Sequence, residues 1–187
     1  METVINQDDL LRHITETIGK TKVLKLTDIL YNRNFEIKDL IELTFYPEKD
    51  IAFRAAWILE NLVLIRPQRF MDDIEYLITQ FFKVKNKSVL RHYTKIIMHL
   101  TGPKMDKMVR EKVALLDMEA VVERCFDLII DPKMPVAVKV FSSQVLFNLR
   151  TRFNWIPEIL TTQLRLMMNG GKPGIQSKCR NLLSYLE

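Results

Sequence analysis

The stretch from Glu48 to Pro67 has the clearest alternation of hydrophobic and polar positions in the chain. Its apolar residues recur at spacings of three and four, which places them on one face of an α-helix. Pro47 and Pro67 lie at its two ends, and proline is tolerated at the edge of a helix but not in its interior. We therefore expect one long amphipathic helix over 48–66. Its apolar face comprises Ile51, Ala55, Ile58, Leu59 and Leu62.

The same apolar pattern returns three times downstream, over 88–100, 137–149 and 174–186. In register, Leu62, Leu100, Leu149 and Leu186 are equivalent, and the steps between them are 38, 49 and 37 residues. A further amphipathic segment precedes each copy, so the repeating unit is a pair of helices. Helix pairs that repeat every ~35–47 residues are typical of an α-solenoid. The sequence therefore predicts an all-α solenoid of about five pairs.

These segments predict a single domain over residues 1–187, with few glycine or proline interruptions. The first helix is expected to start at a cap on Asn6 or Asp8 and to run to about Ile18. The predicted parts are an N-terminal capping hairpin over 1–33, helical repeats over 35–66, 68–101, 117–153 and 155–186, and one inserted helix over 105–116.

The motif Phe53-Arg54, followed by Ala55-Ala56 and an apolar run from Leu59 to Leu62, resembles the HEAT and armadillo class of repeats in small bacterial-type proteins. A weaker copy begins at Val138-Lys139. The resemblance implies a helical scaffold for interactions, but such repeats bind many unrelated partners. It also implies a structural role for Arg54, paired with an aspartate of a neighbouring repeat such as Asp50 or Asp131.

The repeat register predicts which side chains share the inner surface of the solenoid. The second helix of each pair lines that surface, and positions i, i+3 and i+7 of each helix share one face. We call these positions the inner lane. No acidic residue occurs in it, although solvation of a polar helix face is an alternative explanation. The predicted partner-binding residues are Arg54, Trp57, Asn61, His92, Lys95, His99, Gln144, Asn148, Lys178, Asn181 and Tyr185.

The positive charge of the chain is unevenly distributed. The net charge is +5, but residues 83–112 alone hold nine basic and two acidic side chains, a net +7. Such a segment can attract nucleic acid or an acidic protein surface if its charges form one patch. A solvated lysine-rich connection between helices is the alternative.

Candidate chemistry for catalysis or cofactors is missing from the sequence. It contains no glycine-rich phosphate loop and no HExxH or CxxC motif. His92 and His99 would lie ~10 Å apart along one helix, too far to share a zinc ion. We expect no catalytic residue, metal or cofactor. Cys125 and Cys179 fall on apolar helical stripes, as small hydrophobes in a reducing cytoplasm. No apolar run spans a membrane, and no signal peptide is evident.

Two enzyme families offer weaker resemblances. The HEAT-like DNA-alkylation-repair family uses a basic groove with a tryptophan and a carboxylate. Trp57 and the basic residues Arg54, His92 and Lys95 match that groove in kind. Asn61 stands one turn after Trp57, and an amide cannot supply the charge that stabilises a sugar cation. The fumarase and adenylosuccinate lyase superfamily has a loop like SSxMPxKxN, of which only Met134-Pro135 is present.

The leading hypothesis is therefore a cytoplasmic, non-catalytic interaction module that presents the inner lane to a protein or peptide. Arg54, Trp57 and Tyr185 would be its anchors, because arginine and aromatic residues dominate binding hot spots. The alternative is a nucleic-acid-binding HEAT-like protein, with a relation to DNA alkylation repair as its extreme form.

Overall fold

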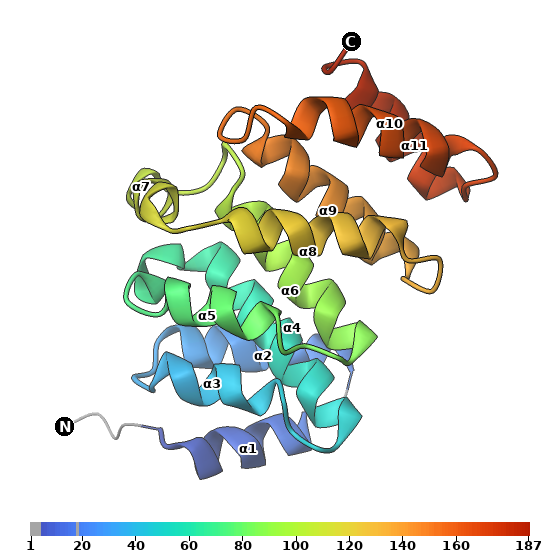
Figure 1. Cartoon of the computed structure of the whole chain (residues 1–187). Helices are drawn as coiled ribbons and strands as arrows, with labels where there is room; N and C mark the ends of the chain where they lie inside the picture. The colour runs from blue at the N-terminus through green and yellow to red at the C-terminus, as the bar shows by residue number, and fades with distance from the viewer. Residues whose placement is uncertain (1–4, 18) are drawn as a thin grey trace. The chain divides into compact units, whose positions relative to one another are not determined.

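The computed structural model describes residues 5–17 and 19–187 and confirms an all-α fold for them. These residues form eleven α-helices and one 3₁₀ helix (Figure 1). The described part contains no named strand; Ile5 and Phe35 form one isolated bridge. The chain divides into two compact units, residues 1–96 and 97–187, which we describe separately. No described helix is long and apolar enough to cross a bilayer.

The first unit is built from paired helices. α4 packs against both α2 and α3, and α1 packs against α3 and α4. The predicted segment after Pro67 starts as a 3₁₀ turn, so its α-helix is shorter than the pattern suggested. The bounds are α1 Gln7–Glu16, α2 Lys20–Tyr31, α3 Ile37–Leu43, α4 Lys49–Ile65, η1 Pro67–Phe70, α5 Ile74–Phe81 and α6 Lys87–Leu100, which continues into the second unit.

The second unit repeats the arrangement. α8 packs along α9, and α9 and α11 both pack against α10. α7 lies within the predicted inserted segment 105–116. The bounds are α7 Lys107–Leu115, α8 Glu119–Ile130, α9 Val136–Leu149, α10 Ile156–Met168 and α11 Pro173–Leu183.

At the N-terminus, Asn6 rather than Asp8 caps α1. The Asn6 Oδ1 atom accepts a hydrogen bond of 2.9 Å from the backbone N–H of Asp9. α1 ends at Glu16, and the predicted end at Ile18 lies outside the described residues.

The repeat register of the second helices matches their burial. Ile58, Ile96, Val145 and Leu182, which are equivalent in the pattern, are each at most 1 % exposed. Leu62, Leu100 and Leu149 are also buried. Leu186 is only partly buried, which departs from the pattern, because α11 already ends at Leu183.

Tyr93 occupies the position that is small in the other copies. Ala55, Ser142 and Cys179 stand there in the others, and all four side chains are buried. The Tyr93 hydroxyl pairs with the Thr44 hydroxyl at 2.8 Å, so the phenol is buried with its polar atom bonded. Burial raises the pKa of Tyr93 well above its ordinary value. The large ring is therefore accommodated as a neutral, hydrogen-bonded core residue.

Cationic side chains from later elements cap the carbonyl ends of helices in the first unit. Arg66 donates to the Tyr31 carbonyl at 2.8 Å. Arg69 donates to the carbonyls of Leu30 at 3.1 Å and Arg33 at 2.7 Å. α2 has no basic residue in its own last turn. The two arginines therefore satisfy free carbonyls and the negative end of the α2 dipole.

The second unit uses the same device. Arg152 donates to the Val113 carbonyl at 3.3 Å and to the Leu116 carbonyl, at the end of α7. Lys139 on α9 donates to the Ile129 carbonyl of α8 at 3.0 Å. α8, like α2, lacks a basic residue in its last turn. Helix ends in both units are thus closed by side chains distant in sequence.

We predict that Arg69→Met lowers the free energy of unfolding of the first unit by about 1.5–3 kcal/mol, the value of a charged hydrogen-bond group. Methionine keeps the apolar stem and removes the donors. The measurement is urea denaturation followed by Trp57 fluorescence in a Trp155→Phe background, because Trp57 then reports on the first unit alone.

The matched control is Arg33→Met, which removes the same charge from an exposed side chain. We expect it to change the free energy of unfolding by less than about 0.5 kcal/mol. Equal losses for the two variants would show that net charge, rather than capping, is responsible.

Candidate functional site

Arg54, the first residue of the predicted inner lane, is a helix cap in the structure. Its Nη1 atom donates to the carbonyls of Ile14 at 3.0 Å and Thr15 at 2.9 Å, in the last turn of α1. The expected pairing with Asp50 or Asp131 is therefore replaced by backbone capping. This role holds α1 against α4 and leaves Arg54 a poor candidate for a partner anchor.

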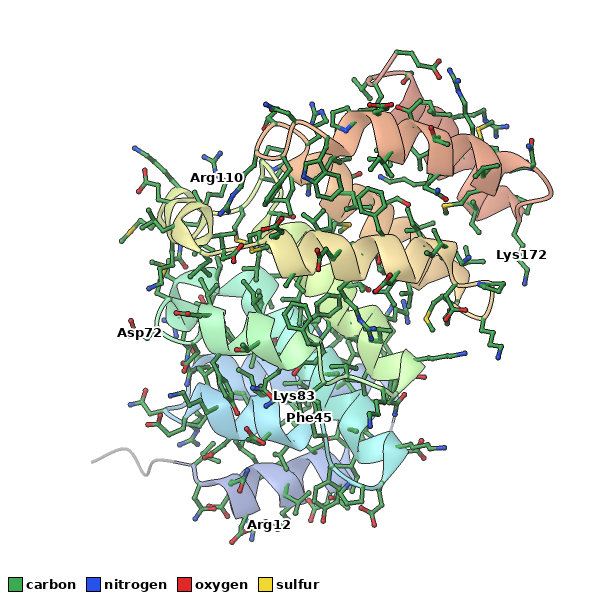
Figure 2. All side chains as sticks on the ribbon, viewed as in Figure 1. Arg12, Phe45, Asp72, Lys83, Arg110 and Lys172 are labelled. Carbon is green, nitrogen blue, oxygen red and sulfur yellow. The ribbon has the colours of Figure 1, made fainter. Side chains whose placement is uncertain are left out.

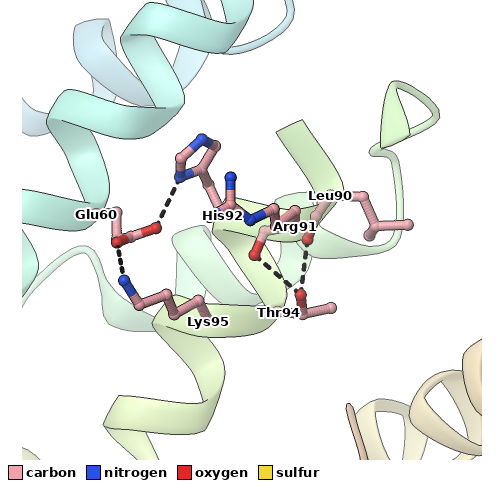
Figure 3. A network of polar contacts seen from close by, with 6 residues as sticks. All are labelled: Glu60, Leu90, Arg91, His92, Thr94 and Lys95. Atoms are coloured by element: carbon pink, nitrogen blue, oxygen red, sulfur yellow. Dashed lines mark hydrogen bonds and ion pairs between the residues drawn. The ribbon is translucent and has the colours of Figure 1, made fainter. Parts of the chain in front are cut away.

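A buried carboxylate, Glu60, connects α4 to α6 in the first unit (Figure 3). Its Oε2 atom lies 2.7 Å from His92 Nδ1, and its Oε1 atom accepts from Lys95 Nζ at 2.5 Å. Glu60 is 4 % exposed and His92 is 2 % exposed. A carboxylate can only accept hydrogen bonds, so His92 Nδ1 carries the proton that joins them. Two predicted lane residues, His92 and Lys95, are thus used to hold the helices together.

The charge of Glu60 is stabilised despite its burial. Burial by itself raises the pKa of Glu60, but hydrogen bonds from His92 and Lys95 and the nearby positive charge outweigh it. The pKa of Glu60 consequently lies below its ordinary value of 4.5. The network therefore contains an ionised carboxylate at neutral pH, with both oxygens occupied.

Trp57 lies over this network in a small aromatic cluster. Its ring is stacked on His92, with centroids 6.3 Å apart and planes 21° apart. Phe53 packs against both rings, 5.7 Å from Trp57 and 5.1 Å from His92. Trp57 and Phe53 are partly exposed, whereas His92 is buried beneath them. We call Phe53, Trp57 and His92 the aromatic ledge.

Two buried nitrogens near the ledge lack hydrogen-bond partners among the described residues. They are Nε2 of His92 and Nδ2 of Asn61, which is also a predicted lane residue. A buried donor or acceptor without a partner costs about 1–3 kcal/mol. Such atoms are uncommon in folded proteins. The remaining lane residue on α6, His99, is partly exposed in the last turn.

In the second unit, five polar groups form one network of hydrogen bonds, and three of them belong to predicted lane residues. Gln144 Nε2 donates to Asn148 Oδ1 at 2.8 Å. Asn148 Nδ2 donates in turn to the Met98 carbonyl at 3.0 Å and Thr101 Oγ1 at 3.2 Å. Lys178 on α11 donates to Gln144 Oε1. Gln144, Asn148 and Lys178 therefore connect α11 to α9 and α9 to the end of α6.

Burial lowers the pKa of Lys178 from its ordinary value. Its ammonium group faces an amide oxygen rather than a carboxylate. This lysine is consequently a partly desolvated cation.

The other two lane residues of the second unit remain accessible. Tyr185 is 69 % exposed, and Asn181 is also exposed. The Tyr185 ring meets Phe147 edge-on at 6.0 Å, and the Arg150 guanidinium lies 3.8 Å over the Phe147 ring. Phe147, Arg150 and Tyr185 form a second aromatic cluster, which we call the α9 cluster.

Sequence reasoning missed Glu60, Phe53 and the α9 cluster members Phe147 and Arg150. Glu60 directly precedes a lane position and lies at the edge of an apolar stripe, whereas the next second helix carries His92 and Lys95. A lone acid beside a lane without acids is a signal that could have suggested this pairing. The contact of Arg150 with its neighbour Phe147 depends on side-chain orientation, for which the sequence carries no comparable signal.

Neither a metal site nor a reactive thiol emerges from the described residues. No three His, Cys, Asp or Glu side chains within them lie close enough together to hold a metal ion. Both cysteines are buried, and burial raises the pKa of the Cys125 thiol to about 12. A thiol with so high a pKa stays protonated at neutral pH and is a poor nucleophile.

We predict that Glu60→Gln destabilises the first unit by about 2–3 kcal/mol at pH 7, because it leaves His92 and Lys95 without their carboxylate. The pKa of Glu60 is lower in the folded protein than its ordinary value of 4.5. Its contribution to the free energy of unfolding is therefore complete above pH 4.5 and disappears as the pH falls through the pKa of the folded state. Urea denaturation at a series of pH values should show that the difference in free energy of unfolding between wild type and Glu60→Gln decreases below pH 4.5. A constant difference between pH 7 and pH 3 would contradict the ion pair.

Comparison with known proteins places this architecture in a family. A family model described as a HEAT repeat domain matches residues 10–186. No curated protein and no solved structure matches the chain. The family match extends over nearly the whole sequence, and it confirms the predicted resemblance and the all-α solenoid fold class. The chain therefore belongs to the HEAT repeat family.

Proposed function

We propose that this HEAT repeat protein is a non-catalytic binding module, and that a protein or peptide contacts the second helices of its pairs. Membership of the family supports a role as a repeat scaffold or interaction module. The observation that carries the proposal is the aromatic ledge of the first unit. In it, the partly exposed Trp57 stacks on the buried His92, in the middle of the predicted inner lane.

The ledge has the properties of a binding hot spot. Tryptophan contributes large contact area with few rotatable bonds, and it is enriched among residues that dominate binding energy. Phe53 and His92 fix the Trp57 ring from two sides, and Glu60 fixes His92 from below. A partner therefore loses little affinity to ordering this surface.

Lys95 sets the polar character of the surface beside the ledge. Its side chain is 30 % exposed, and its ammonium group is paired with the buried carboxylate of Glu60. The charge available to a partner is consequently reduced. An apolar or aromatic side chain with nearby hydrogen-bonding groups fits this surface better than a strongly charged one.

The α9 cluster supports the same function for the second unit. Tyr185 is largely exposed, its ring meets Phe147, and Arg150 lies over the Phe147 ring. Arginine and tyrosine, like tryptophan, are enriched at binding hot spots. The hydrogen-bond chain through Gln144 and Asn148 stabilises the helix that carries Phe147.

The geometry around Trp57 also favours binding over catalysis. The nearest carboxylate on α4 is Glu60, which is 4 % exposed and has both oxygens engaged. It is not placed to stabilise a positive charge that develops on a bound ligand. Asn61, the residue at the expected acid position, is an amide with a buried Nδ2 atom.

Trp57→Ala is predicted to remove a specific set of proteins from those captured by the immobilised full chain in a lysate of its native host. The other tryptophan provides a matched control, because Trp155 is also partly exposed and packs on Phe126 and Phe153 outside the inner lane. Mass spectrometry of proteins captured by wild type, Trp57→Ala and Trp155→Ala should show losses that are specific to the first variant.

Identical lists for all three proteins would count against the ledge. Because truncation of a packed tryptophan can cost ~3–5 kcal/mol, circular dichroism must first show that both variants are folded. Trp57→Phe is the gentler substitution, and we expect it to weaken capture of the same proteins. Arg54→Ala is unsuitable for this test, since loss of the α1 cap would change the structure itself.

Nucleic-acid binding remains the alternative proposal, because exposed cations are frequent over 83–112. In the first unit, Lys95 is paired with Glu60, whereas Lys83, Lys85 and Lys87 line a separate cleft. The ionic-strength dependence of binding to random DNA and RNA separates the two proposals. Phosphate contacts predict a steep loss of affinity with salt.

A further inference from the structure

A lysine-lined cleft in the first unit lies apart from the aromatic ledge. It has a volume of about 740 Å³ and lies between the segments 44–52 and 83–89, where α4 and α6 begin. Among the described residues, no acidic side chain lines it. Its basic lining residues are Lys49, Lys83, Lys85 and Lys87.

Three of these lysines carry positive charge that no ion pair within the described residues neutralises. The side chains of Lys49, Lys83 and Lys85 form no ion pair with any described residue. Like charges in one cleft repel one another, and a bound anionic group relieves that repulsion. The cleft is therefore complementary to a ligand with more than one negative charge.

An aromatic side chain forms one wall of the cleft. Figure 2 shows Phe45 close to Lys83, and both residues line the cleft. Phe45 is 36 % exposed, and its ring meets buried Tyr93 edge-on at 6.3 Å. The exposed face of Phe45 is consequently available for an apolar group that accompanies the anion.

The same wall also borders an acidic hollow. Phe45, Tyr46 and Pro47 also line a second hollow of about 350 Å³, which contains Asp8 and Glu42. This segment, which we call the 45–47 ridge, therefore separates a basic cleft from an acidic hollow. A basic cleft and an acidic hollow that share a short apolar ridge are complementary to a ligand with the reverse distribution of charge.

We propose that the 45–47 ridge binds an extended peptide of mixed charge. Carboxylates of the peptide enter the lysine-lined cleft, an apolar side chain packs on Phe45, and a basic side chain reaches Asp8 and Glu42. A nucleic-acid strand suits the cleft less well, because its uniformly negative backbone would be repelled at the hollow. This surface is independent of the aromatic ledge, since Trp57 lines neither hollow.

The test uses fluorescence anisotropy of labelled synthetic peptides with the full chain. The probe is a decapeptide with three glutamates, a central phenylalanine and two lysines, in that order. Replacing its glutamates by glutamines should weaken binding at least tenfold, because the contacts with the lysines are lost. Replacing its lysines by glutamates should weaken binding roughly threefold, as expected for one or two exposed charge pairs. An oligodeoxythymidine of ten nucleotides serves as the nucleic-acid probe and should bind more weakly than the decapeptide.

Variants of the protein locate the binding. Lys83→Glu combined with Lys85→Glu should weaken binding of the decapeptide at least tenfold. Lys104→Glu combined with Lys172→Glu makes the same change in net charge at exposed positions of the second unit, and it should alter the affinity less than twofold. Asp8→Asn should reduce the preference for the lysine-containing peptide. Trp57→Phe should leave decapeptide binding unchanged, which separates this proposal from the ledge.

Three results would overturn the proposal. The first is no measurable decapeptide binding by the wild-type chain at low salt. The second is an equal loss of affinity in the cleft variant and the charge-matched control. The third is tighter binding of the oligonucleotide than of the decapeptide, which would assign the cleft to nucleic acid. If the charge reversal disturbs folding, Lys83→Gln with Lys85→Gln provides a milder variant. We expect it to lose an intermediate amount of decapeptide affinity.

Discussion

The burial of one apolar face on each second helix is the constraint on which the structure depends. Ala55, Ile58 and Leu59 on α4 are completely buried, as are Val145 and Leu146 on α9. Each large aliphatic side chain contributes about 1.5–3 kcal/mol when it is fully buried. A typical hydrogen bond contributes less, about 0.5–1.5 kcal/mol, and the buried apolar residues are far more numerous than the buried polar ones. The apolar face therefore fixes the rotation of each helix, and the opposite face is polar by consequence.

Polar groups from other helices complete this packing. A short helix leaves its last carbonyls without partners, and burying them unpaired would be costly. Arg54, Arg69 and Arg152 bring their guanidinium groups to the ends of α1, α2 and α7. The same bonds hold elements of one unit together, so one side chain serves both purposes. Long, branched donors suit this role, because arginine reaches several carbonyls from one position.

The polar face is consequently less available to partners than its composition implies. His92, Lys95, Asn148 and Lys178 are all engaged with neighbouring helices. What remains accessible is mainly aromatic, at Trp57 and at the α9 cluster. This arrangement gives a binding surface whose contact residues are already fixed before a partner arrives. The cost near the ledge is two buried nitrogens, on Asn61 and His92, that have no hydrogen-bond partner among the described residues.

The sequence by itself determined the helices and their register, because the 3.6-residue period is a local property that each segment expresses independently. Ile58, Ile96, Val145 and Leu182 could be aligned by pattern alone, and the structure buries all four. Only the tertiary structure decided the partners of the polar residues. Glu60 lies 32 residues before His92, and Asn148 lies 50 residues after Met98. Such bonds depend on how helices cross and on side-chain rotamers, neither of which leaves a periodic trace in the chain.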